Sequence, residues 1–425
     1  MTSIAARGLS WLAAASLVAA CSSSSTPIVA MPQPDANSTS PTFCGRGTDV
    51  LGVAPADGFC LKHYAQIGEA RSLAFAPNGD LFVGAPSRVT GGGASGGPGA
   101  IMLLTDDNHD GVAEEHVFLS QLGPKTKLDD VHAVALGGGF LYFTTSSTVW
   151  RLPYTTGDRV PSGPPEDLKL PSAYGTGGRF THGLARSAMG QLLTSKGTYG
   201  SCGDSQGGDV SAIAADGTLS PLAVGLRNPM YIRCHATDEV CAAMELGEDN
   251  LPGAREKMIM LHPQTNYGFP CCLTAAAPVP NISAALGMMC DTVTAEDASF
   301  TLSDTPFGFD WEPGNWPAPF TGAVFVARHG SFYSSPSWKG AGIVYAPTDP
   351  VTHAPIATSG DAGAAVGEAD WKPFQDGFGP GGSVLDRPSD VAFSPDGRMF
   401  IADDQSGRVF WMAPTTLMAP DATTN

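Results

Sequence analysis

Short runs of alternating apolar and polar residues recur along this chain of 425 residues, and glycine-containing turns separate them. "LAFAPNGDLFVGA" (73–85) and "VAFSPDGRMFIAD" (391–403) match position by position. Each predicts a strand, a tight turn and a second strand, because Asn-Gly and Asp-Gly steps supply the positive φ values that such a turn requires. The pattern therefore predicts β-hairpins that repeat along the chain.

Degenerate copies of the same hairpin lie between these two stretches, in "VHAVALGGGFLYFTTSSTVWRL", "THGLARSAMGQLLTSKG" and "FTGAVFVARHGS". No helical period separates them. Hairpins that recur tens of residues apart are typical of an all-β propeller built from four-stranded antiparallel blades. We expect the first and last blades to lie side by side and close the ring. A β-sandwich with two similar hairpins is the alternative.

Composition and charge agree with a soluble β protein. The 52 glycines and 35 prolines, with only 15% charged residues, suit many short strands joined by turns. The 23 basic and 41 acidic residues give a formal net charge of −18. This charge repels phosphate backbones and anionic lipid, so we expect no nucleic-acid partner.

The first residues resemble an export signal, with Arg7 followed by an apolar run over residues 9–20 that is too short to span a bilayer. "VAAC" (18–21) is similar to a bacterial lipobox, in which Cys21 would carry lipid and become the mature N-terminus. A plain secretory signal followed by a chance cysteine is the alternative. Ser22, in place of aspartate, favours the outer membrane, so the expected location is the bacterial cell envelope, with the membrane contacted only through the lipid.

The predicted domain organisation follows from these segments. Residues 1–20 are the signal peptide, and residues 21–43 are a flexible tether rich in Ser, Thr and Pro. Residues 44–415 form the propeller, and residues 416–425 form a disordered tail.

The eight cysteines that remain after Cys21 are an even number, which in an oxidising compartment predicts disulfides. Their close spacing favours Cys44 with Cys60 and Cys234 with Cys241. The other four would pair among themselves, either as two separate bridges or with a strained bridge between neighbours: Cys202, Cys271, Cys272 and Cys290.

Several motifs together resemble the soluble PQQ-dependent glucose dehydrogenase and sorbosone (aldose sugar) dehydrogenase family, over about residues 70–412. They are "GLRNPMYIRC" (225–234), "ELGEDNLPGAREKMIMLHPQTNYGFP" (245–270), the closing "RPSDVAFSPDGRMFIADDQSGRVF" (387–410) and "FTHGLARSAMGQLLTSKGTYGSCGD" (180–204). The resemblance implies a six-bladed propeller that oxidises the anomeric carbon of a sugar, with hydride passing to PQQ held by Ca²⁺ in the central funnel. The implied partners are a small sugar and an external electron acceptor.

His182 is the candidate catalytic base. An imidazole titrates near neutral pH and can take the proton of a sugar hydroxyl, and a histidine at the start of a strand can face the funnel of a propeller. A histidine bonded to a neighbouring loop is the alternative.

Arg227 and Asn228 suit a cofactor with carboxylates and a quinone, because arginine donates to a carboxylate with two parallel bonds. Pairing of Arg227 with a structural acid, such as Asp204 or Glu245, is the alternative. By resemblance, Arg387 faces the cofactor and stabilises charge on the reduced quinone.

The cofactor-binding lysine of the family has two candidate counterparts here, His329 and Lys339. Gly247 and Glu248 are the candidate Ca²⁺ ligands through main-chain oxygens, because calcium takes hard oxygen donors.

A second acidic loop, "DDNHDG" (106–111), starts like an EF-hand loop but places Val117 where that motif requires glutamate. A calcium site through Asp106, Asn108 and Asp110 and a solvated turn both remain open.

Two positions depart from the family. Leu246 stands where the glucose dehydrogenases have a glutamine, and Ser389 where they have a second arginine. These changes favour, as an alternative, a cell-surface binding propeller that has lost its cofactor. A further alternative is a lactonase-type propeller, which requires Asp, Glu and Asn around a metal, and such carboxylates are not evident at the matched positions.

Overall fold

The computed structural model describes residues 42–87, 99–128, 130–171, 174, 182–200, 202, 208–248, 251, 253–274, 277–279, 290–330, 340–358, 366–379 and 385–420. The predicted signal peptide, Cys21 and most of the tether lie outside these residues. In the described ranges, no helix has both the length and the apolar character needed to cross a membrane.

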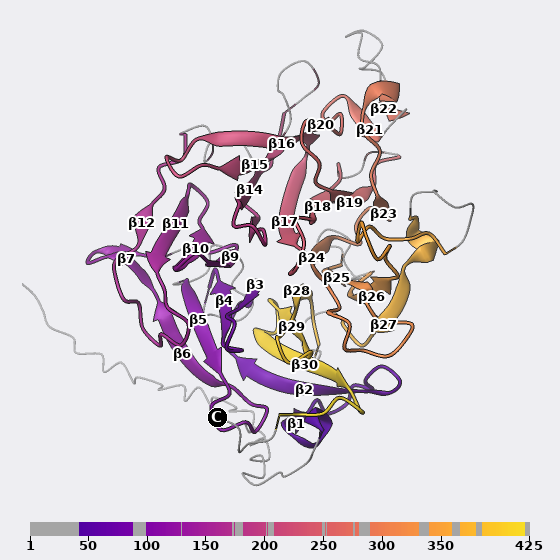
Figure 1. Cartoon of the computed structure of the whole chain (residues 1–425). Coiled ribbons are helices and arrows are strands. Elements are labelled where there is room, and N and C mark those ends of the chain that lie inside the picture. Colours follow the sequence, from indigo (N-terminus) through magenta and orange to yellow (C-terminus); the bar gives the residue numbers. More distant parts are fainter. Residues whose placement is uncertain are drawn as a thin grey trace, which may run out of the picture. The chain divides into compact units, whose positions relative to one another are not determined.

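Six β-sheets surround a common hub (Figure 1). Blade 1 contains β3 (Ser72–Phe75), β4 (Leu81–Ala85), β5 (Ala100–Thr105) and β6 (Glu114–Leu119). Blade 2 contains β9 (Val134–Gly137), β10 (Phe140–Thr144), β11 (Val149–Pro153) and β12 (Glu166–Asp167). Blade 3 contains β13 (Leu184–Arg186), β14 (Leu192–Lys196), β15 (Gly208–Ile213) and β16 (Leu219–Leu226), with β20 (Thr265–Asn266) added parallel to β16.

The remaining blades follow the same order outward from the hub. Blade 4 contains β17 (Asn228–Cys234), β18 (Cys241–Leu246), β19 (Glu256–Met260) and β23 (Ala298–Phe300). Blade 5 contains β24 (Pro306–Trp311), β25 (Val324–Arg328), β26 (Gly342–Ala346) and β27 (Lys372–Gln375). Blade 6 contains β28 (Pro388–Phe393), β29 (Met399–Asp403), β30 (Arg408–Pro414), β2 (Phe59–Gln66) and β1 (Thr48–Asp49).

Several short elements lie outside the main sheets of the blades. Two small ribbons pair β7 (Gln121–Gly123) with β8 (Thr126–Lys127), and β21 (Cys272–Thr274) with β22 (Ala277–Pro278). The described 3₁₀ helices are η1 (Phe43–Gly45), η4 (Cys290–Thr292) and η5 (Glu368–Asp370).

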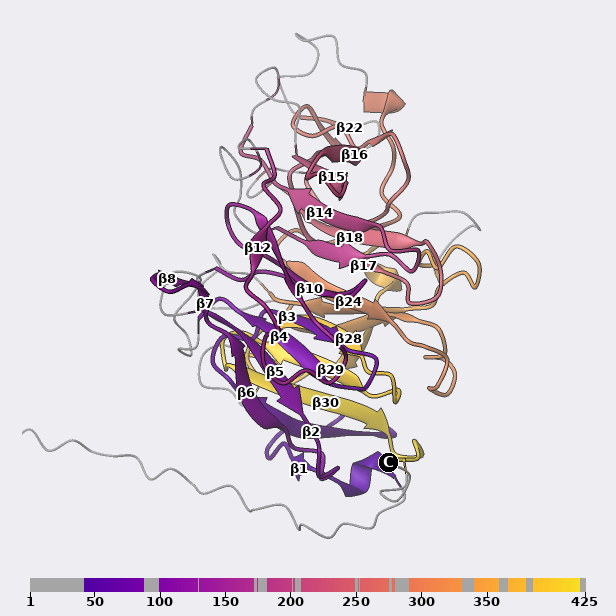
Figure 2. The same cartoon turned by 60° about the vertical axis from the view of Figure 1, so that its left-hand side comes forward.

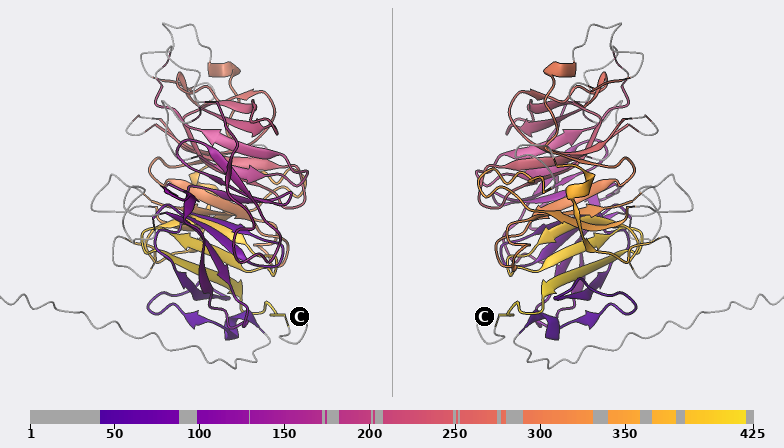
Figure 3. Two further views of the ribbon diagram at one scale, coloured as in Figure 1. Left: turned by 90° about the vertical axis from the view of Figure 1, so that its left-hand side faces the viewer. Right: turned by 90° about the vertical axis from the view of Figure 1, so that its right-hand side faces the viewer.

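The ring closes through strands from both ends of the described chain. β2 pairs antiparallel with β30, from Phe59 opposite Pro414 to Gln66 opposite Arg408. Figures 2 and 3 show the indigo β2 beside the yellow β30. The inner strand β28 of this blade also contacts β3 of blade 1. The predicted six-bladed propeller, closed by its first and last segments, is confirmed, and the sandwich alternative is wrong.

The predicted hairpin turns form as the sequence indicates. The backbone N–H of Ala76 donates to the Asp80 carbonyl, and that of Ser394 donates to the Arg398 carbonyl. Gly79 and Gly397 adopt φ of +90° and +88°, a region that side chains disfavour, so glycine is required at both turns.

The middle strands are buried on both faces. Every residue of β4 and of β29 is buried, because each blade lies between two neighbours and neither face of its second strand reaches solvent. This burial explains why these strands are apolar runs rather than strict alternations.

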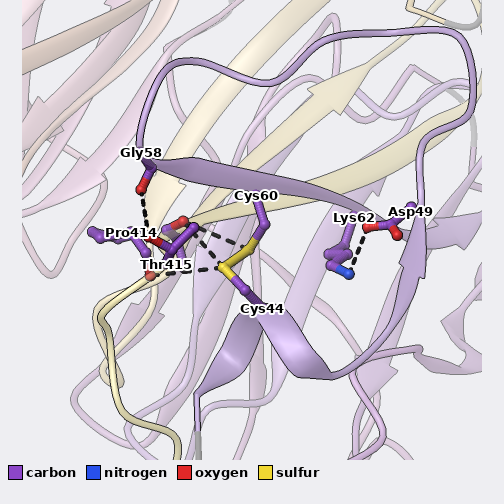
Figure 4. Close-up of a disulfide and its surroundings, with 8 residues drawn as sticks. Cys44, Asp49, Gly58, Cys60, Lys62, Pro414 and Thr415 are labelled. Atoms are coloured by element: carbon purple, nitrogen blue, oxygen red, sulfur yellow. Dashed lines mark hydrogen bonds and ion pairs between the residues drawn. A yellow bond between two sulfur atoms is a disulfide. The ribbon is translucent and has the colours of Figure 1, made fainter. Parts of the chain in front are cut away.

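The disulfides follow the predicted pattern. Cys44 is bonded to Cys60 and Cys234 to Cys241, as the spacing predicted. The other four cysteines form two separate bridges, Cys202–Cys271 and Cys272–Cys290, so neighbouring cysteines are not joined to each other. Figure 4 shows the Cys44–Cys60 bridge beside Thr415, whose N–H donates to the Gly58 carbonyl at 2.9 Å.

Substitution of Phe59 on β2 tests whether this N-terminal strand contributes to the stability of the closed ring. Its ring centroid lies 4.8 Å from that of Trp316, 5.3 Å from Phe320 and 5.0 Å from Phe374, all in blade 5. Phe59→Ala should lower the free energy of unfolding by about 3–5 kcal/mol in urea denaturation, because it leaves a cavity in this aromatic cluster.

The control is Val117→Ala on the outer strand β6, where the side chain is 45% exposed and the expected change is within about 0.5 kcal/mol. Equal stabilities for the two variants would show that β2 does not contribute to closure.

Candidate active site at the hub

Polar side chains converge at the end of the hub where the inner strands begin. Arg71, His132, His182, Arg227 and Arg387 each come within two residues of the start of an inner strand. Because β-strands within a blade are antiparallel, the ends of the second strands reach the same place. We call this set the hub mouth: Glu69, Arg71, His132, His182, Arg227, Asn228, His329, Arg387 and Asp404.

His182 is held with its two ring nitrogens in different environments. Nδ1 lies 2.8 Å from the Ser195 carbonyl oxygen, and Nε2 lies 3.3 Å from that of Ser146. Burial lowers the pKa of His182, so the neutral ring carries one N–H. The shorter contact assigns that proton to Nδ1 and leaves the lone pair on Nε2. The ring of Tyr174 stacks on the imidazole at 4.3 Å.

Two small residues connect His182 to the next blade. A Cβ on Gly183 would approach both the Ser195 Oγ and the Met230 carbonyl at 3.0 Å, so glycine allows β13 to lie close to β17. The Ser195 hydroxyl accepts the Gly183 N–H at 2.7 Å and donates to the Pro229 carbonyl at 2.5 Å. Ser195 thus joins the predicted base to the Arg-Asn-Pro segment. The alternative of a histidine bonded to neighbouring loops also describes these contacts.

Arg227 pairs with an acid, Glu248, that the sequence did not suggest as its partner. Its Nε lies 2.9 Å from a carboxylate oxygen of Glu248, and its Nη1 donates to the carbonyl of Gly247. Glu245 instead accepts the backbone N–H of Arg227 at 2.6 Å, and Asp204 lies outside the described residues. Of the two main-chain oxygens predicted to bind Ca²⁺, that of Gly247 accepts from the Arg227 guanidinium, whereas Glu248 contacts it through its side-chain carboxylate.

On another side of the hub mouth, Asp404 contacts a histidine and an arginine. Its carboxylate accepts from His329 Nε2 at 2.9 Å and pairs with Arg71 at 3.1 Å. Burial alone would raise the pKa of Asp404, but His329 and Arg71 lower it to about 2. Arg71 also pairs with Glu69 at 3.1 Å. Burial lowers the pKa of His329 to about 4, and its ring stacks on Phe307 at 4.2 Å.

Arg387 is a buried cation that donates to carbonyl oxygens. Its guanidinium donates to those of His329 at 3.1 Å and Gly330 at 2.7 Å. Burial lowers the pKa of Arg387 to about 10, and Arg71 acts in the same direction, whereas Asp404 opposes the shift. An additional anion at the hub mouth would therefore stabilise Arg387. Lys339, the other candidate cation, lies outside the described residues.

Five polar atoms of the hub mouth are buried without a hydrogen-bond partner in the described part of the chain. They are Glu69 Oε2, Arg71 Nε, His132 Nδ1, Asn228 Oδ1 and His329 Nδ1. Each such atom costs about 1–3 kcal/mol, and native proteins contain few of them. Their concentration at one end of the hub is typical of a site that receives a polar ligand.

Arg71 lies in none of the motifs that indicated the site, but its position in the hairpin repeat is equivalent to that of His182. In three blades a residue whose N–H closes the hairpin turn stands five positions after the hub residue: Ala76 after Arg71, Ser187 after His182, and Ser394 after Ser389. The buried Ser389 hydroxyl donates to the Ala70 carbonyl at 2.6 Å. Ser389 therefore lies next to the segment of the adjacent blade that carries Arg71.

Two other predicted features are accounted for. Leu246 packs against the shared core of blades 4 and 5, which explains an apolar residue there. In the 106–111 loop, the N–H of Gly111 donates to Asp106 Oδ1 at 3.2 Å, and the N–H of Asp110 donates to Asn108 Oδ1 at 2.9 Å. The loop is closed by its own bonds, as a solvated turn would be, and calcium binding there stays a prediction.

The fold is similar to those of several solved structures. A Trichoderma reesei protein of carbohydrate-active enzyme family AA12 is 17% identical, with 89% of this chain and 99% of that chain covered at a TM-score of 0.64. The PQQ domain of a pyranose dehydrogenase from Coprinopsis cinerea, in its holo form, is 16% identical, with coverage of 85% and 96% and a TM-score of 0.64. The soluble aldose sugar dehydrogenase from Escherichia coli, in its apo form, is 12% identical, with coverage of 84% and 99% and a TM-score of 0.56.

At these identities the similarity shows a shared propeller fold. No protein-family model matches the sequence, and a search of curated proteins finds no significant match.

His132 should make the stability depend on pH. Burial lowers the pKa of His132 to about 3, so between about pH 3 and 6.5 the unfolded chain binds a proton there that the folded chain does not. Its contribution to stability is present above pH 6.5 and is lost as the pH falls. The free energy of unfolding of wild type minus that of His132→Gln should fall by about 1.4 kcal/mol per pH unit between pH 6 and 4.5.

Urea denaturation at several pH values measures this difference. Comparison with the variant cancels other buried groups, such as Asp390, whose pKa burial raises to about 7 and which acts in the opposite sense. A difference that stays constant from pH 7.5 to 4.5 would show that His132 accepts a proton in the folded protein.

Proposed function

We propose that the protein is an oxidoreductase that oxidises a sugar at its anomeric carbon with PQQ as cofactor. The observation that carries the proposal is that His182, the Arg227–Asn228 pair and Arg387, far apart in the sequence, reach the same end of the hub. Proteins with the same fold that are named as PQQ-dependent sugar dehydrogenases support it.

The residues of the hub mouth fit a flat anionic cofactor. Arg387, Arg227 and Arg71 supply positive charge, and guanidinium groups bind carboxylates with two parallel bonds. Asn228 Oδ1 and His132 Nδ1 are among the buried atoms that have no hydrogen-bond partner among the described residues. A tricarboxylate that carries quinone oxygens and a ring N–H offers both acceptors and a donor to such atoms. Arg227 and Arg387 would hold its carboxylates, and Asn228 would bond its ring edge.

Calcium fits this arrangement less well. The Gly247 carbonyl and the Glu248 carboxylate both contact the Arg227 guanidinium, which occupies the place of a cation. A calcium ion at these oxygens requires Arg227 to turn away toward the cofactor. Calcium therefore remains part of the proposal as a ligand to be tested, and no step of the chemistry below depends on it.

PQQ, when bound, supplies an acceptor for the hydride of the anomeric carbon. The protein's own residues would accept the proton and stabilise the charge that develops. The Ser195 carbonyl fixes the His182 proton on Nδ1, so Nε2 can accept the proton of the anomeric hydroxyl as hydride leaves. That hydroxyl would take the place of the Ser146 carbonyl beside Nε2. Arg387 and Arg71 would stabilise the negative charge that develops.

Export completes the proposal. Four disulfides suit an oxidising compartment, which the N-terminal sequence also indicates. The protein would be anchored to the bacterial envelope through Cys21 and would pass electrons from the sugar to an external acceptor.

The test uses purified protein, PQQ and a panel of aldoses, with dye reduction as the activity and calorimetry for PQQ binding, each with and without Ca²⁺. His182→Gln should bind PQQ within about threefold of wild type but lose about 10²–10⁴-fold in kcat, because only the base is removed. Arg387→Lys should weaken PQQ binding by at least about tenfold, because the paired donors are lost. His116→Gln, on the exposed face of β6, is the matched control and should change neither.

Each outcome decides between the alternatives. Absence of PQQ binding by folded protein overturns the proposal. Binding without turnover of any sugar favours a binding propeller, and unchanged kcat in His182→Gln removes the proposed base. Lactone hydrolysis by the protein without PQQ would favour a lactonase.

A further inference from the structure

Two histidines and an aspartate meet at the end of the hub opposite the hub mouth. His235 follows the end of β17, and Asp238 lies in the same hairpin before β18. His353 belongs to the loop that follows β26 of blade 5. One ligand atom of each, either a ring nitrogen or a carboxylate oxygen, lies within 4.8 Å of the other two. We call this group the His-Asp-His cluster.

The hairpin of blade 4 that carries His235 and Asp238 is tied at its base. The Cys234–Cys241 disulfide joins its two ends, and the N–H of His235 donates to the Val240 carbonyl at 2.8 Å. These bonds restrict where the two side chains can lie.

Hydrogen bonds also hold the loop of blade 5 that carries His353. Asp349 Oδ1 accepts the N–H groups of Val351 and Thr352 at 2.9 and 2.8 Å. The N–H of His353 donates to the Asp349 carbonyl at 2.9 Å, and the His353 carbonyl accepts the indole N–H of Trp311 at 3.0 Å. A site whose side chains are already positioned loses little entropy when it binds a ligand.

The three side chains converge on one oxygen. Asp238 Oδ2 lies 3.1 Å from His235 Nδ1 and 2.9 Å from His353 Nε2. In the described part of the chain, these histidines are its ion-pair partners. Arg233, on the strand that His235 follows, pairs with Asp310 at 3.2 Å and Asp390 at 3.0 Å. The Thr237 hydroxyl also donates to Asp238 Oδ2 at 3.1 Å. About half of the Asp238 side chain, 49%, reaches solvent, from which a cation can approach.

We propose that the His-Asp-His cluster binds a divalent transition-metal ion of the Zn²⁺ class and thereby joins blade 4 to blade 5. Two imidazole nitrogens and one carboxylate oxygen are ligands that zinc accepts, and the exposed side leaves a fourth position for water. Imidazole does not suit Ca²⁺ or Mg²⁺, which take oxygen ligands, so the site is selective.

Binding requires a small rearrangement. The two rings are stacked, with centroids 3.7 Å apart and planes 13° from parallel. A metal ion lies in the plane of each imidazole that binds it, so the rings must tilt toward a common point and give up their bonds to Asp238. The Asp238 side chain is 49% exposed, whereas those of His235 and His353 are 17% and 14% exposed, so a metal ion would enter from the side of Asp238.

The experiment uses the whole protein after treatment with EDTA and measures Zn²⁺ binding by calorimetry, Co²⁺ binding by visible absorption, and the thermal midpoint with each ion. Wild type should bind one Zn²⁺ at this site, show the intense absorption of tetrahedral Co²⁺, and melt a few degrees higher with excess Zn²⁺, because the ion binds only the folded chain. Ca²⁺ and Mg²⁺ should reproduce none of these effects at this site.

Two variants remove ligands without disturbing the loops. Asp238→Asn keeps the shape of the side chain, and His353→Asn suits a residue whose φ is +55°, since asparagine tolerates that region. Each should weaken Zn²⁺ binding at least about tenfold, which is the least that even outer-shell substitutions cost in metal sites. His116→Gln on β6 is the control for non-specific binding to an exposed histidine.

The proposal is overturned if wild type binds no Zn²⁺, or if both asparagine variants bind it as wild type does. Unchanged thermal midpoints of the EDTA-treated variants show that they are folded. The outcome is independent of the proposed sugar oxidation, because the His-Asp-His cluster and the hub mouth lie at opposite ends of the inner strands.

Discussion

The packing of six twisted sheets around one axis is the constraint from which the site arises. Every blade presents its first strand to the hub and begins that strand at the same end, so residues far apart in the sequence must meet there. Neighbouring inner strands lie so close together that one position requires glycine: a Cβ at Gly183 would come within 3.0 Å of the neighbouring strand. Pairing of β2 with β30 holds the ring closed, so the position of His182 relative to Arg387 depends on strands that carry neither residue.

Two buried polar networks of the hub differ in how well their groups are satisfied. Further along the inner strands, Arg233 pairs with Asp310 and Asp390, and these carboxylates also accept the N–H groups of Phe393 and Leu73 at 2.8 Å. Such a network is complete in itself. At the hub mouth, five buried polar atoms lack partners in the described residues. Buried polar groups are costly unless paired, so this end is where a ligand improves the energy.

The sequence predicted much of the fold because local residue types determine the turns of the hairpin repeat. Asn78-Gly79 and Asp396-Gly397 mark turns by a backbone preference that needs no tertiary information, and cysteine spacing was enough for Cys44–Cys60 and Cys234–Cys241. The pairing of Cys202 with Cys271 could not be predicted, because it depends on how loops of blades 3 and 4 meet.

The hub mouth was predicted only in part, for a related reason. His182, Arg227 and Arg387 lie in motifs, whereas Asp404 is an ordinary residue after a strand until the ring brings it to His329 and Arg71. The partner of Arg227 was also missed: Glu248, two residues beyond the end of β18, reaches its guanidinium, whereas Glu245 on β18 accepts its backbone N–H. The strand pattern does not set the conformation of the residues that follow the strand.

The hairpin repeat shows which residues of different blades occupy equivalent positions, and the motifs alone do not. Arg71, His182 and Ser389 stand at the same place in their blades, five residues before the turn. Residues at this place in neighbouring blades lie close together, since both reach the same axis. Ser389 bonds to the carbonyl of Ala70, the residue before Arg71, and shows how near the two places are. The charge of the hub mouth is thus a property of the ring, and a departure at a single position does not determine what the site can hold.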